Sequence, residues 1–394
     1  MRIVLFYSEI DSFNFAADEL EREFQLRGHE VFILDLNNPP KENPHSYQHL
    51  MQFMVRKVDV VVCFDGIGCR DDLFIEIWDA SGAVVIDILM DPPLRFHTTL
   101  ERHPANYFLF CCDLEHVEYV KKYFGQTVPY VAFMPHAGVM PPQDMPVIPY
   151  ADRKYDVLFT GTYYHYQDRF AQIGQMFAEG SDMYRLYQRM FENLVHDSSL
   201  TIEKALLGTL EQFGWSVPEE MLKTMLRCSE AVDWTIRTWQ RETVIHTLAE
   251  AGTELYLLGK GWQDYPGIRY PNVHVVDGWV HYGRTLEITA ETRISLNVMP
   301  WFKAGTHDRI FNALLQRSVP LTDSSAWLSE NFTDGVDIAY YDLKNLEQLP
   351  VIVQRLLDDV PYAEGIIERG YEKVANNLTW SNCAEWIIAM IQGQ

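Results

Sequence analysis

The stretch YDVLFTGT at residues 155–162 combines an apolar strand with a glycine turn. The later stretch ELYLLG at 254–259 repeats the pattern, and ISLNV at 294–298 reads as a further strand. The apolar residues of the first two stretches are continuous rather than alternating, which is typical of parallel strands that are covered on both faces. We therefore predict a doubly wound α/β domain over residues 155–378.

The same alternation begins at the N-terminus. Residues 3–7 read as a buried strand, residues 16–27 as an amphipathic helix closed by Gly28, and residues 31–34 as the next strand. Further apolar runs lie at 58–62, 83–86, 107–110 and 130–133. The fold class is thus α/β, with a first Rossmann-like domain at 1–139 and a proline-rich linker at 140–154.

The second domain contains a segment without strands. Residues 167–250 carry only helical patterns, and this segment is far longer than the usual strand-to-helix connection of about 2–6 residues. We predict a helical insertion there and a closing helix at 379–394. We interpret the tryptophans and methionines of the insertion as core residues or as a surface that shapes acceptor choice; they include Trp234, Trp239, Met221 and Met225.

Composition limits the partners of the chain. It has 394 residues and a formal net charge of −23, which disfavours nucleic acids and anionic membranes but not a small anionic ligand in a cleft. The six cysteines include no CxxC pair, and several of them lie in apolar runs, so we expect buried free thiols in a reducing compartment. No apolar stretch approaches the roughly 20 residues of a membrane span, and the first residues do not resemble a signal peptide. We expect a cytoplasmic protein without a transmembrane segment.

Glycine turns follow two of the predicted strands in the second domain. They are Gly161 with Thr162, and Gly259 with Lys260 in the stretch GKGW at 259–262. Glycine lets backbone amides approach a diphosphate, and an adjacent lysine neutralises its charge. The alternative is an ordinary strand-to-helix turn. Neither turn has the spacing of a P-loop or of GxGxxG.

The stretch NVMPWFKAGTHDRIFNALL at 297–315 is the most informative for function. Its strand ends at Val298, Thr306 is placed to cap a new helix, and His307 to Arg309 fall in the first turn. Basic residues oppose the helix dipole at that end, so an anionic ligand would balance them. The alternative is that they pair with Asp308 and other acidic groups.

Several motifs together resemble the CgeB-like (spore-maturation-protein-like) glycosyltransferases. In the C-terminal half these are GKGW at 259–262, LNV at 296–298, HDRIFNAL at 307–314, VPLTD at 319–323 and the tail at 370–380. In the N-terminal half they are MDPP at 90–93, DLEH at 113–116 and MPHA at 134–137.

The resemblance implies a GT-B fold of two Rossmann-like domains, with the nucleotide-sugar donor in the C-terminal domain and the acceptor against the N-terminal one. It places Gly161 and Thr162 beside the donor phosphates, and Gly259, Lys260 and Trp279 beside the nucleotide. Lys303, His307 and Arg309 would contact the diphosphate or the sugar in place of a metal, and Thr306 and Asp308 complete the expected donor site.

One feature departs from related retaining enzymes, which often carry an E-x7-E pair at the start of this helix. The corresponding residues here are Ala304 and Asn312. The stereochemical course therefore stays open, and a catalytically inactive GT-B scaffold is an alternative.

An inverting reaction needs a base that deprotonates the acceptor hydroxyl. Asp91, which follows the strand at 83–88, is the first choice, and Asp11, in the loop after the first strand, is the second. The alternatives are a turn-forming aspartate and a helix cap. His97 and His136 are expected to be structural. The aromatic run at 163–166 would either stack on a sugar or pack against the insertion.

These expectations converge on a metal-independent glycosyltransferase without a tightly bound cofactor. Its donor would be a nucleotide sugar, most simply a UDP-sugar, and its acceptor the hydroxyl of an unknown protein, glycan or small molecule. The alternatives are a sugar-nucleotide epimerase or hydrolase and the inactive scaffold named above.

Overall fold

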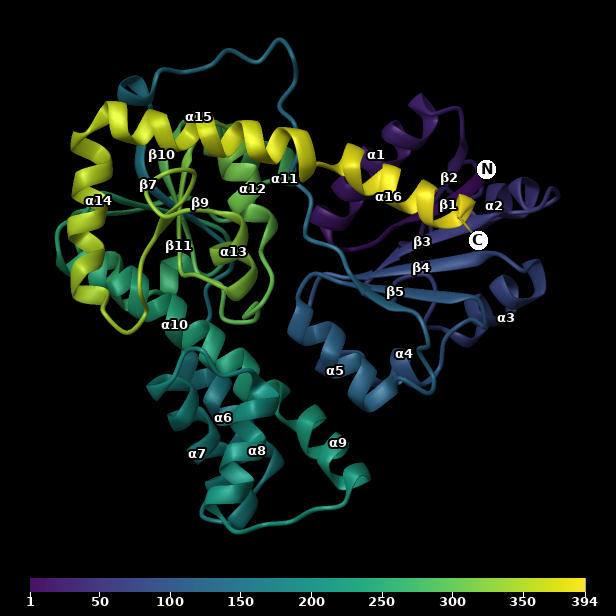
Figure 1. The fold of residues 1–394 in the computed structure, drawn as a ribbon, viewed down its shortest axis with the longest axis horizontal. Coiled ribbons are helices and arrows are strands. Elements are labelled where there is room, and N and C mark those ends of the chain that lie inside the picture. Colours follow the sequence, from purple (N-terminus) through teal and green to yellow (C-terminus); the bar gives the residue numbers. More distant parts are fainter. Residues whose placement is uncertain (394) are drawn as a thin grey trace. The chain divides into compact units, whose positions relative to one another are not determined.

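The computed structural model describes residues 1–393, which divide into two compact units (Figure 1). The N-terminal unit comprises Met1–Val139 and the chain from Ala375 onward, and the C-terminal unit comprises Met140–Val374.

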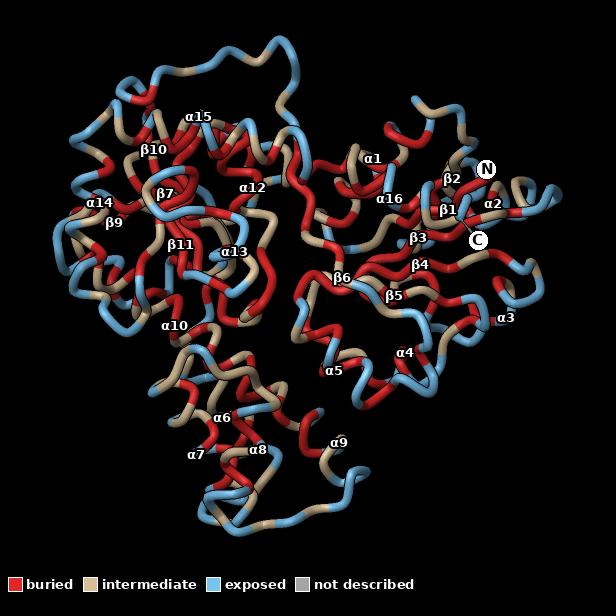
Figure 2. Tube along the Cα trace, viewed as in Figure 1, coloured by how far each residue is buried: buried red, intermediate tan, exposed pale blue. Residues whose placement is uncertain are grey.

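The N-terminal unit is built on a six-stranded parallel sheet with the order β2-β1-β3-β4-β5-β6. The strands are β1 (Arg2–Tyr7), β2 (Glu30–Asp35), β3 (Val60–Phe64), β4 (Val84–Leu89), β5 (Tyr107–Cys111) and β6 (Val131–Phe133). The helices are α1 (Asp11–Leu26), α2 (Tyr47–Phe53), α3 (Asp72–Ser81), α4 (His97–Glu101), α5 (Leu114–Phe124) and α16 (Trp380–Gln392), with the 3-10 turn η1 (Pro93–Arg95). The central strands are buried along their length (Figure 2), as their continuous apolar runs predict.

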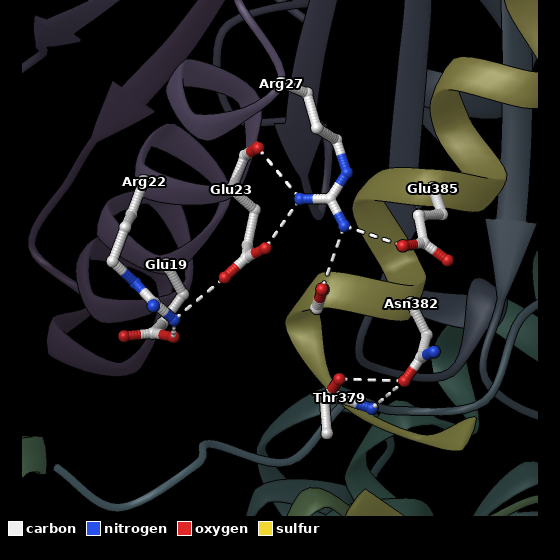
Figure 3. A network of polar contacts seen from close by, with 8 residues as sticks. Glu19, Arg22, Glu23, Arg27, Thr379, Asn382 and Glu385 are labelled. Carbon is white, nitrogen blue, oxygen red and sulfur yellow. Dashed lines mark hydrogen bonds and ion pairs between the residues drawn. The ribbon is translucent and has the colours of Figure 1, made fainter. Parts of the chain in front are cut away.

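The last helix, α16, packs against α1 at the other end of the chain. Arg27 holds the two helices together: its guanidinium contacts Glu23 on α1 and both Ser381 and Glu385 on α16 (Figure 3). Thr379 and Asn382 form a capping box at the start of α16. The chain therefore returns to its first domain after completing the second.

The C-terminal unit has its own six-stranded parallel sheet, with the order β12-β11-β10-β7-β8-β9. The strands are β7 (Tyr155–Thr160), β8 (Leu255–Leu258), β9 (Val273–Asp277), β10 (Thr292–Asn297), β11 (Val319–Thr322) and β12 (Ala339–Tyr340). The helices outside the insertion are α11 (Tyr282–Ala290), α12 (Asp308–Leu315), α13 (Ala326–Asn331), α14 (Leu349–Asp358) and α15 (Val360–Asn377). The 3-10 turns are η2 (Tyr150–Asp152), η3 (Trp262–Asp264), η4 (Pro266–Arg269) and η5 (Leu346–Gln348).

Five helices form the segment between β7 and β8. They are α6 (Tyr166–Met176), α7 (Asp182–His196), α8 (Ile202–Gln212), α9 (Glu219–Cys228) and α10 (Glu230–Glu250). The end of α10 joins the core of the unit, because Val244, Ile245 and Leu248 are buried against the sheet. Met225 is buried, but Met221 is 54% exposed and is not the core residue we expected, because it lies on the outer side of the short helix α9.

The state of the cysteines and the apolar character of the helices were also predicted from the sequence. All six cysteines are free, and all but Cys228 are buried. Within residues 1–393, no helix combines the length and the apolar character needed to cross a membrane.

Candidate functional site

Two glycine turns, at the carboxyl ends of β7 and β8, pack backbone against backbone. The N–H of Gly161 donates to the carbonyl of Leu258 at 2.9 Å, and a Cβ on Gly259 would lie 2.3 Å from the carbonyl oxygen of Gly161. Both glycines have positive φ angles, 150° and 138°. A Cβ on Gly261 would likewise lie 2.5 Å from the carbonyl oxygen of Tyr163. Close backbone packing therefore explains why glycine stands at these positions.

The two packed glycine turns include backbone N–H groups at the edge of the sheet that have no acceptor in the described part of the chain. The N–H groups of Thr162 and Lys260 donate to no protein atom within residues 1–393. Beside them lies Arg241 of α10, which is 5% exposed and whose Nη1 would be 3.7 Å from a Cβ on Gly161. Unbonded N–H groups next to a buried guanidinium form a suitable environment for phosphate oxygens. Arg241 was not predicted, because no local motif marks an arginine in the middle of a helix.

Lys260 and Trp279, predicted to border a nucleotide, lie near each other. The Nζ atom of Lys260 is 5.9 Å from the centre of the Trp279 ring. Trp279 is half exposed, and its other neighbour is the His281 ring at 4.7 Å. An exposed indole beside a cation at a strand end can stack on a planar base.

Helix α12 begins one residue later than expected. Its N-cap is His307, whose Nδ1 accepts a hydrogen bond from the N–H of Arg309 at 3.4 Å. The prediction that Thr306 caps the helix is therefore wrong: its side chain is fully buried, and its hydroxyl has no partner within residues 1–393. The capping position requires an extended residue whose side chain reaches the first turn, and His307 meets that requirement.

Arg309 is held in place by the strand before it. Its Nη1 donates to Oδ1 of Asn297, the last residue of β10, at 3.0 Å. Burial lowers the pKa of the Arg309 guanidinium from its ordinary value, and the nearby Asp308 carboxylate partly opposes this effect. The guanidinium is thus oriented, half-buried and at the start of α12.

The Asp308 carboxylate accepts hydrogen bonds from two side chains. Tyr282, three residues after Trp279, donates to its Oδ2, and Asn312 donates to the same oxygen at 3.4 Å and to the Tyr282 hydroxyl at 2.7 Å. The other carboxylate oxygen of Asp308, Oδ1, lies against Nδ1 of His307. Burial, reinforced by Asp308, raises the pKa of Tyr282 well above its ordinary value.

The same network accounts for the missing acid at position 312. The Asn312 amide is 4% exposed and donates toward the Asp308 carboxylate, whereas a glutamate there would bring a second negative charge close to Asp308.

Lys303 lies beside a buried acid that the sequence analysis did not select. Asp323, directly after β11, is 5% exposed and accepts a hydrogen bond from the N–H of Met299 at 2.7 Å. Burial raises the pKa of Asp323 to about 6, while Lys303 and the Met299 N–H act in the opposite direction. Both side chains line a cavity of 660 Å³. A signal was present, because Asp323 ends the motif VPLTD.

The two proposed bases lie in the N-terminal unit. Asp91 follows β4 and forms an ion pair with Arg95 at 3.0 Å, and Asp11 is the first residue of α1. They are placed at the ends of β4 and β1, which β3 separates in the sheet.

Asp65 is a further carboxylate at this edge. It follows β3 with a left-handed backbone conformation, at a φ of 50°. Its Oδ1 accepts hydrogen bonds from the N–H groups of Met90 and Asp91 at 2.8 and 3.3 Å. Burial, Asp91 and Asp87 raise the pKa of Asp65 well above its ordinary value. Nothing in the local sequence distinguishes Asp65 from an ordinary turn residue.

In the aromatic run after Gly161, Tyr163 is buried and Tyr164 is exposed. Tyr163 packs on Trp262 at 5.0 Å and donates to Glu242 of α10, so it packs against the insertion. Tyr164 is 45% exposed, and the Arg169 guanidinium carbon lies 4.0 Å from the centre of its ring. His97 has a structural role, because its Nε2 is 2.7 Å from the Tyr119 hydroxyl in a buried pair.

The C-terminal unit thus gathers the predicted donor residues on one edge of its sheet, after β7, β8, β9 and β10, while Asp91 and Asp11 belong to the other unit. In open α/β sheets, ligands bind at the carboxyl ends of the strands. Within residues 1–393, no group of three or more His, Cys, Asp or Glu side chains is arranged to hold a metal ion.

Comparisons with known proteins identify the fold. Residues 237–389 match the family model described as glycosyl transferase-like. The chain is similar in structure to sucrose-phosphate synthase from Thermosynechococcus elongatus, with a TM-score of 0.54, 11% identity and coverage of 100% of this chain and 98% of that one. An α-glucosyltransferase solved with UDP and a 13-mer DNA gives a TM-score of 0.56 at 11% identity, with both chains fully covered. HepE from Anabaena, solved with UDP and glucose, gives 0.51 at 9% identity, also over the full length of both chains.

No curated protein matches the sequence of this chain. The structural matches confirm the predicted GT-B fold of two Rossmann-like domains. The family model confirms the glycosyltransferase prediction for the C-terminal part of the chain, residues 237–389.

Proposed function

We propose that this GT-B protein transfers a sugar from a nucleotide-sugar donor, with UDP as the nucleotide, to an acceptor hydroxyl. The observation that carries the proposal is the pair of interlocked glycine turns at Gly161 and Gly259. They present the N–H groups of Thr162 and Lys260 beside the buried Arg241. Proteins solved with UDP and with UDP and glucose share the fold, which supports the choice of nucleotide.

The donor diphosphate would lie along the edge of the C-terminal sheet. Its oxygens would accept from the N–H groups of the two turns and from Arg309 at the start of α12. The nucleobase of the donor would stack on the Trp279 indole, beside Lys260, whose Nζ lies 5.9 Å from the centre of that ring. These fixed donors would stabilise the charge that develops on the departing diphosphate, which is the main requirement of glycosyl transfer.

The acceptor hydroxyl would lose its proton to Asp91, the base that we propose first. Its ion pair with Arg95 fixes the position of the carboxylate. We further propose that the reaction needs no metal, that the protein belongs to the CgeB-like branch of these enzymes, and that it works in the reducing cytoplasm, which its six free thiols support.

The test is donor binding followed by turnover. UDP is expected to raise the unfolding temperature of the full chain, and UDP-glucose, UDP-galactose and UDP-N-acetylglucosamine are compared as donors with and without EDTA. A transferase leaves most of the donor intact until an acceptor mixture is added. Rapid hydrolysis of the donor alone would point to a hydrolase, and failure of UDP and all three donors to stabilise the protein would contradict the proposal.

A further inference from the structure

Two adjoining cavities lie where the helical insertion meets the loop after β12 in the C-terminal unit. The first has a volume of 630 Å³ and lies among α6, α7, α10 and the loop, with Tyr166, Phe191 and Trp239 in its wall. The second has a volume of 660 Å³ and extends to Lys303 and Asp323. Ser198 and Leu343 line both, so the two cavities form one continuous groove. Each volume is in the range of small-ligand sites.

The wall of the first cavity is aromatic. Phe191 and Trp239 lie edge to face, with ring centres 6.5 Å apart, and both are partly exposed, as is Tyr166. Partly exposed rings in a groove offer flat apolar faces with polar atoms at the rim. The apolar face of a pyranose ring matches such a surface in size and shape.

A buried amide in the same wall lacks a partner. Gln240 is 2% exposed, lines the first cavity, and its Oε1 accepts no hydrogen bond within residues 1–393. Buried polar atoms are almost always hydrogen-bonded. We therefore expect a bound ligand to supply the hydrogen-bond donor for this oxygen. A sugar hydroxyl supplies that donor.

The charges of the groove disfavour an anion. Its carboxylates are Glu192, Asp323, Asp334 and Asp342. Lys344 is engaged by Asp197 at 2.9 Å, and Lys303 faces the buried Asp323. Glu192 pairs with Arg189 at 2.8 Å. A groove richer in carboxylates than in free cations repels phosphates and accepts hydrogen bonds from vicinal hydroxyls.

We propose that this groove binds a neutral oligosaccharide, with a sugar ring on Trp239 and a hydroxyl donating to Gln240. Saccharide binding follows from the groove itself. The role of that saccharide as the glycan acceptor or product rests on the proposed function, and Lys303 connects the groove to the edge where the donor is proposed to bind.

The test is saturation-transfer NMR and calorimetry on the full chain with three probes: maltotriose, cellotriose and chitotriose. At least one is expected to bind, and Trp239→Ala and Gln240→Leu are each expected to weaken that binding at least tenfold. Trp215→Ala, a partly exposed tryptophan of the same insertion outside both cavities, serves as the matched control and should bind as the unaltered protein does.

Stabilisation by UDP is measured on every variant and is expected to be unchanged, which separates this site from the donor site. If Trp239→Ala does not fold, the Gln240→Leu variant decides the question. The proposal is overturned if none of the three probes binds, or if binding persists in the Gln240→Leu variant. If UDP does not stabilise the unaltered protein, that result instead contradicts the proposed function.

Discussion

The α-carbon of Gly259 faces the carbonyl group of Gly161 so closely that a Cβ on Gly259 would lie 2.3 Å from the carbonyl oxygen. Two turns that are far apart in the sequence are thereby joined at the ends of the neighbouring strands β7 and β8. This contact leads to the first prediction.

Replacing Gly259 with alanine should disrupt both turns. The new methyl group would overlap backbone atoms, and the φ of 138° is strained for any L side chain. We expect a loss of about 2 kcal/mol or more in unfolding free energy, and loss of the stabilisation by UDP. Urea unfolding with and without UDP measures both. Gly278→Ala is the control, because the nearest atom to its Cβ is Gln263 Nε2 at 3.6 Å; equal losses in the two variants would show that the turn contact is unimportant.

Arg309 should matter more for turnover than for stability. Removing its guanidinium leaves Asn297 Oδ1 without its 3.0 Å partner, which costs about 1 kcal/mol, whereas losing a charge that faces the transition state costs about 100-fold in kcat. Steady-state kinetics of Arg309→Ala test this. Arg284→Ala, an exposed arginine on α11 paired with Glu287, should keep full activity. Unchanged turnover in Arg309→Ala would remove Arg309 from the mechanism.

Asp323 predicts a pH-dependent stability. Its pKa in the folded protein is about 6, above the ordinary value of 3.8, so the folded state holds a proton that the unfolded state releases between these pH values. Its contribution to stability therefore falls as the pH rises from about 4 to about 6. Relative to the unaltered protein, Asp323→Asn should gain up to about 3 kcal/mol between pH 4 and pH 7.

Urea unfolding at pH 4, 5, 6 and 7 measures this difference. Lys344 lowers the pKa of Asp197 to about 2, so Asp197 titrates below this range, and Asp197→Asn serves as the control. A constant difference between Asp323→Asn and the unaltered protein at all four pH values would be evidence against the prediction.

If Asp91 is the base, its replacement should lower turnover without weakening donor binding. Asp91→Asn keeps the size of the side chain near Arg95, so the fold should hold, while turnover falls at least 100-fold. Stabilisation by UDP should not change, because Asp91 lies in the N-terminal unit. Asp11→Asn is the comparison. If Asp11→Asn loses turnover and Asp91→Asn does not, the second candidate is the base.

Arg27 should control the docking of the last helix. It contacts Glu23, Ser381 and Glu385, whereas Arg22 is 54% exposed and contacts only α1 (Figure 3). We expect Arg27→Ala to cost about 1 kcal/mol and to accelerate amide hydrogen exchange in α16, and Arg22→Ala to do neither. Hydrogen exchange followed by mass spectrometry resolves the helix. Equal exchange in both variants would mean that apolar packing alone holds α16.

Local pattern was enough to predict the strands and the glycine turns. The apolar run at 155–160 became β7, and the apolar run at 254–258 became β8. These features depend on residues that are near one another in the chain. The start of α12 was misplaced by one residue, because the choice between Thr306 and His307 depends on backbone angles that the surrounding loop imposes.

The sequence alone determined that two parallel-sheet domains form and that glycines and basic residues follow the strands of the second, since burial and turn chemistry are written in neighbouring residues. Only the tertiary structure decided which of them meet. Arg241 reaches the Gly161 turn from the insertion, Asp323 lies buried beside Lys303, and Tyr282 donates to Asp308. Such contacts join distant segments, and their charges interact strongly because packing removes the water between them.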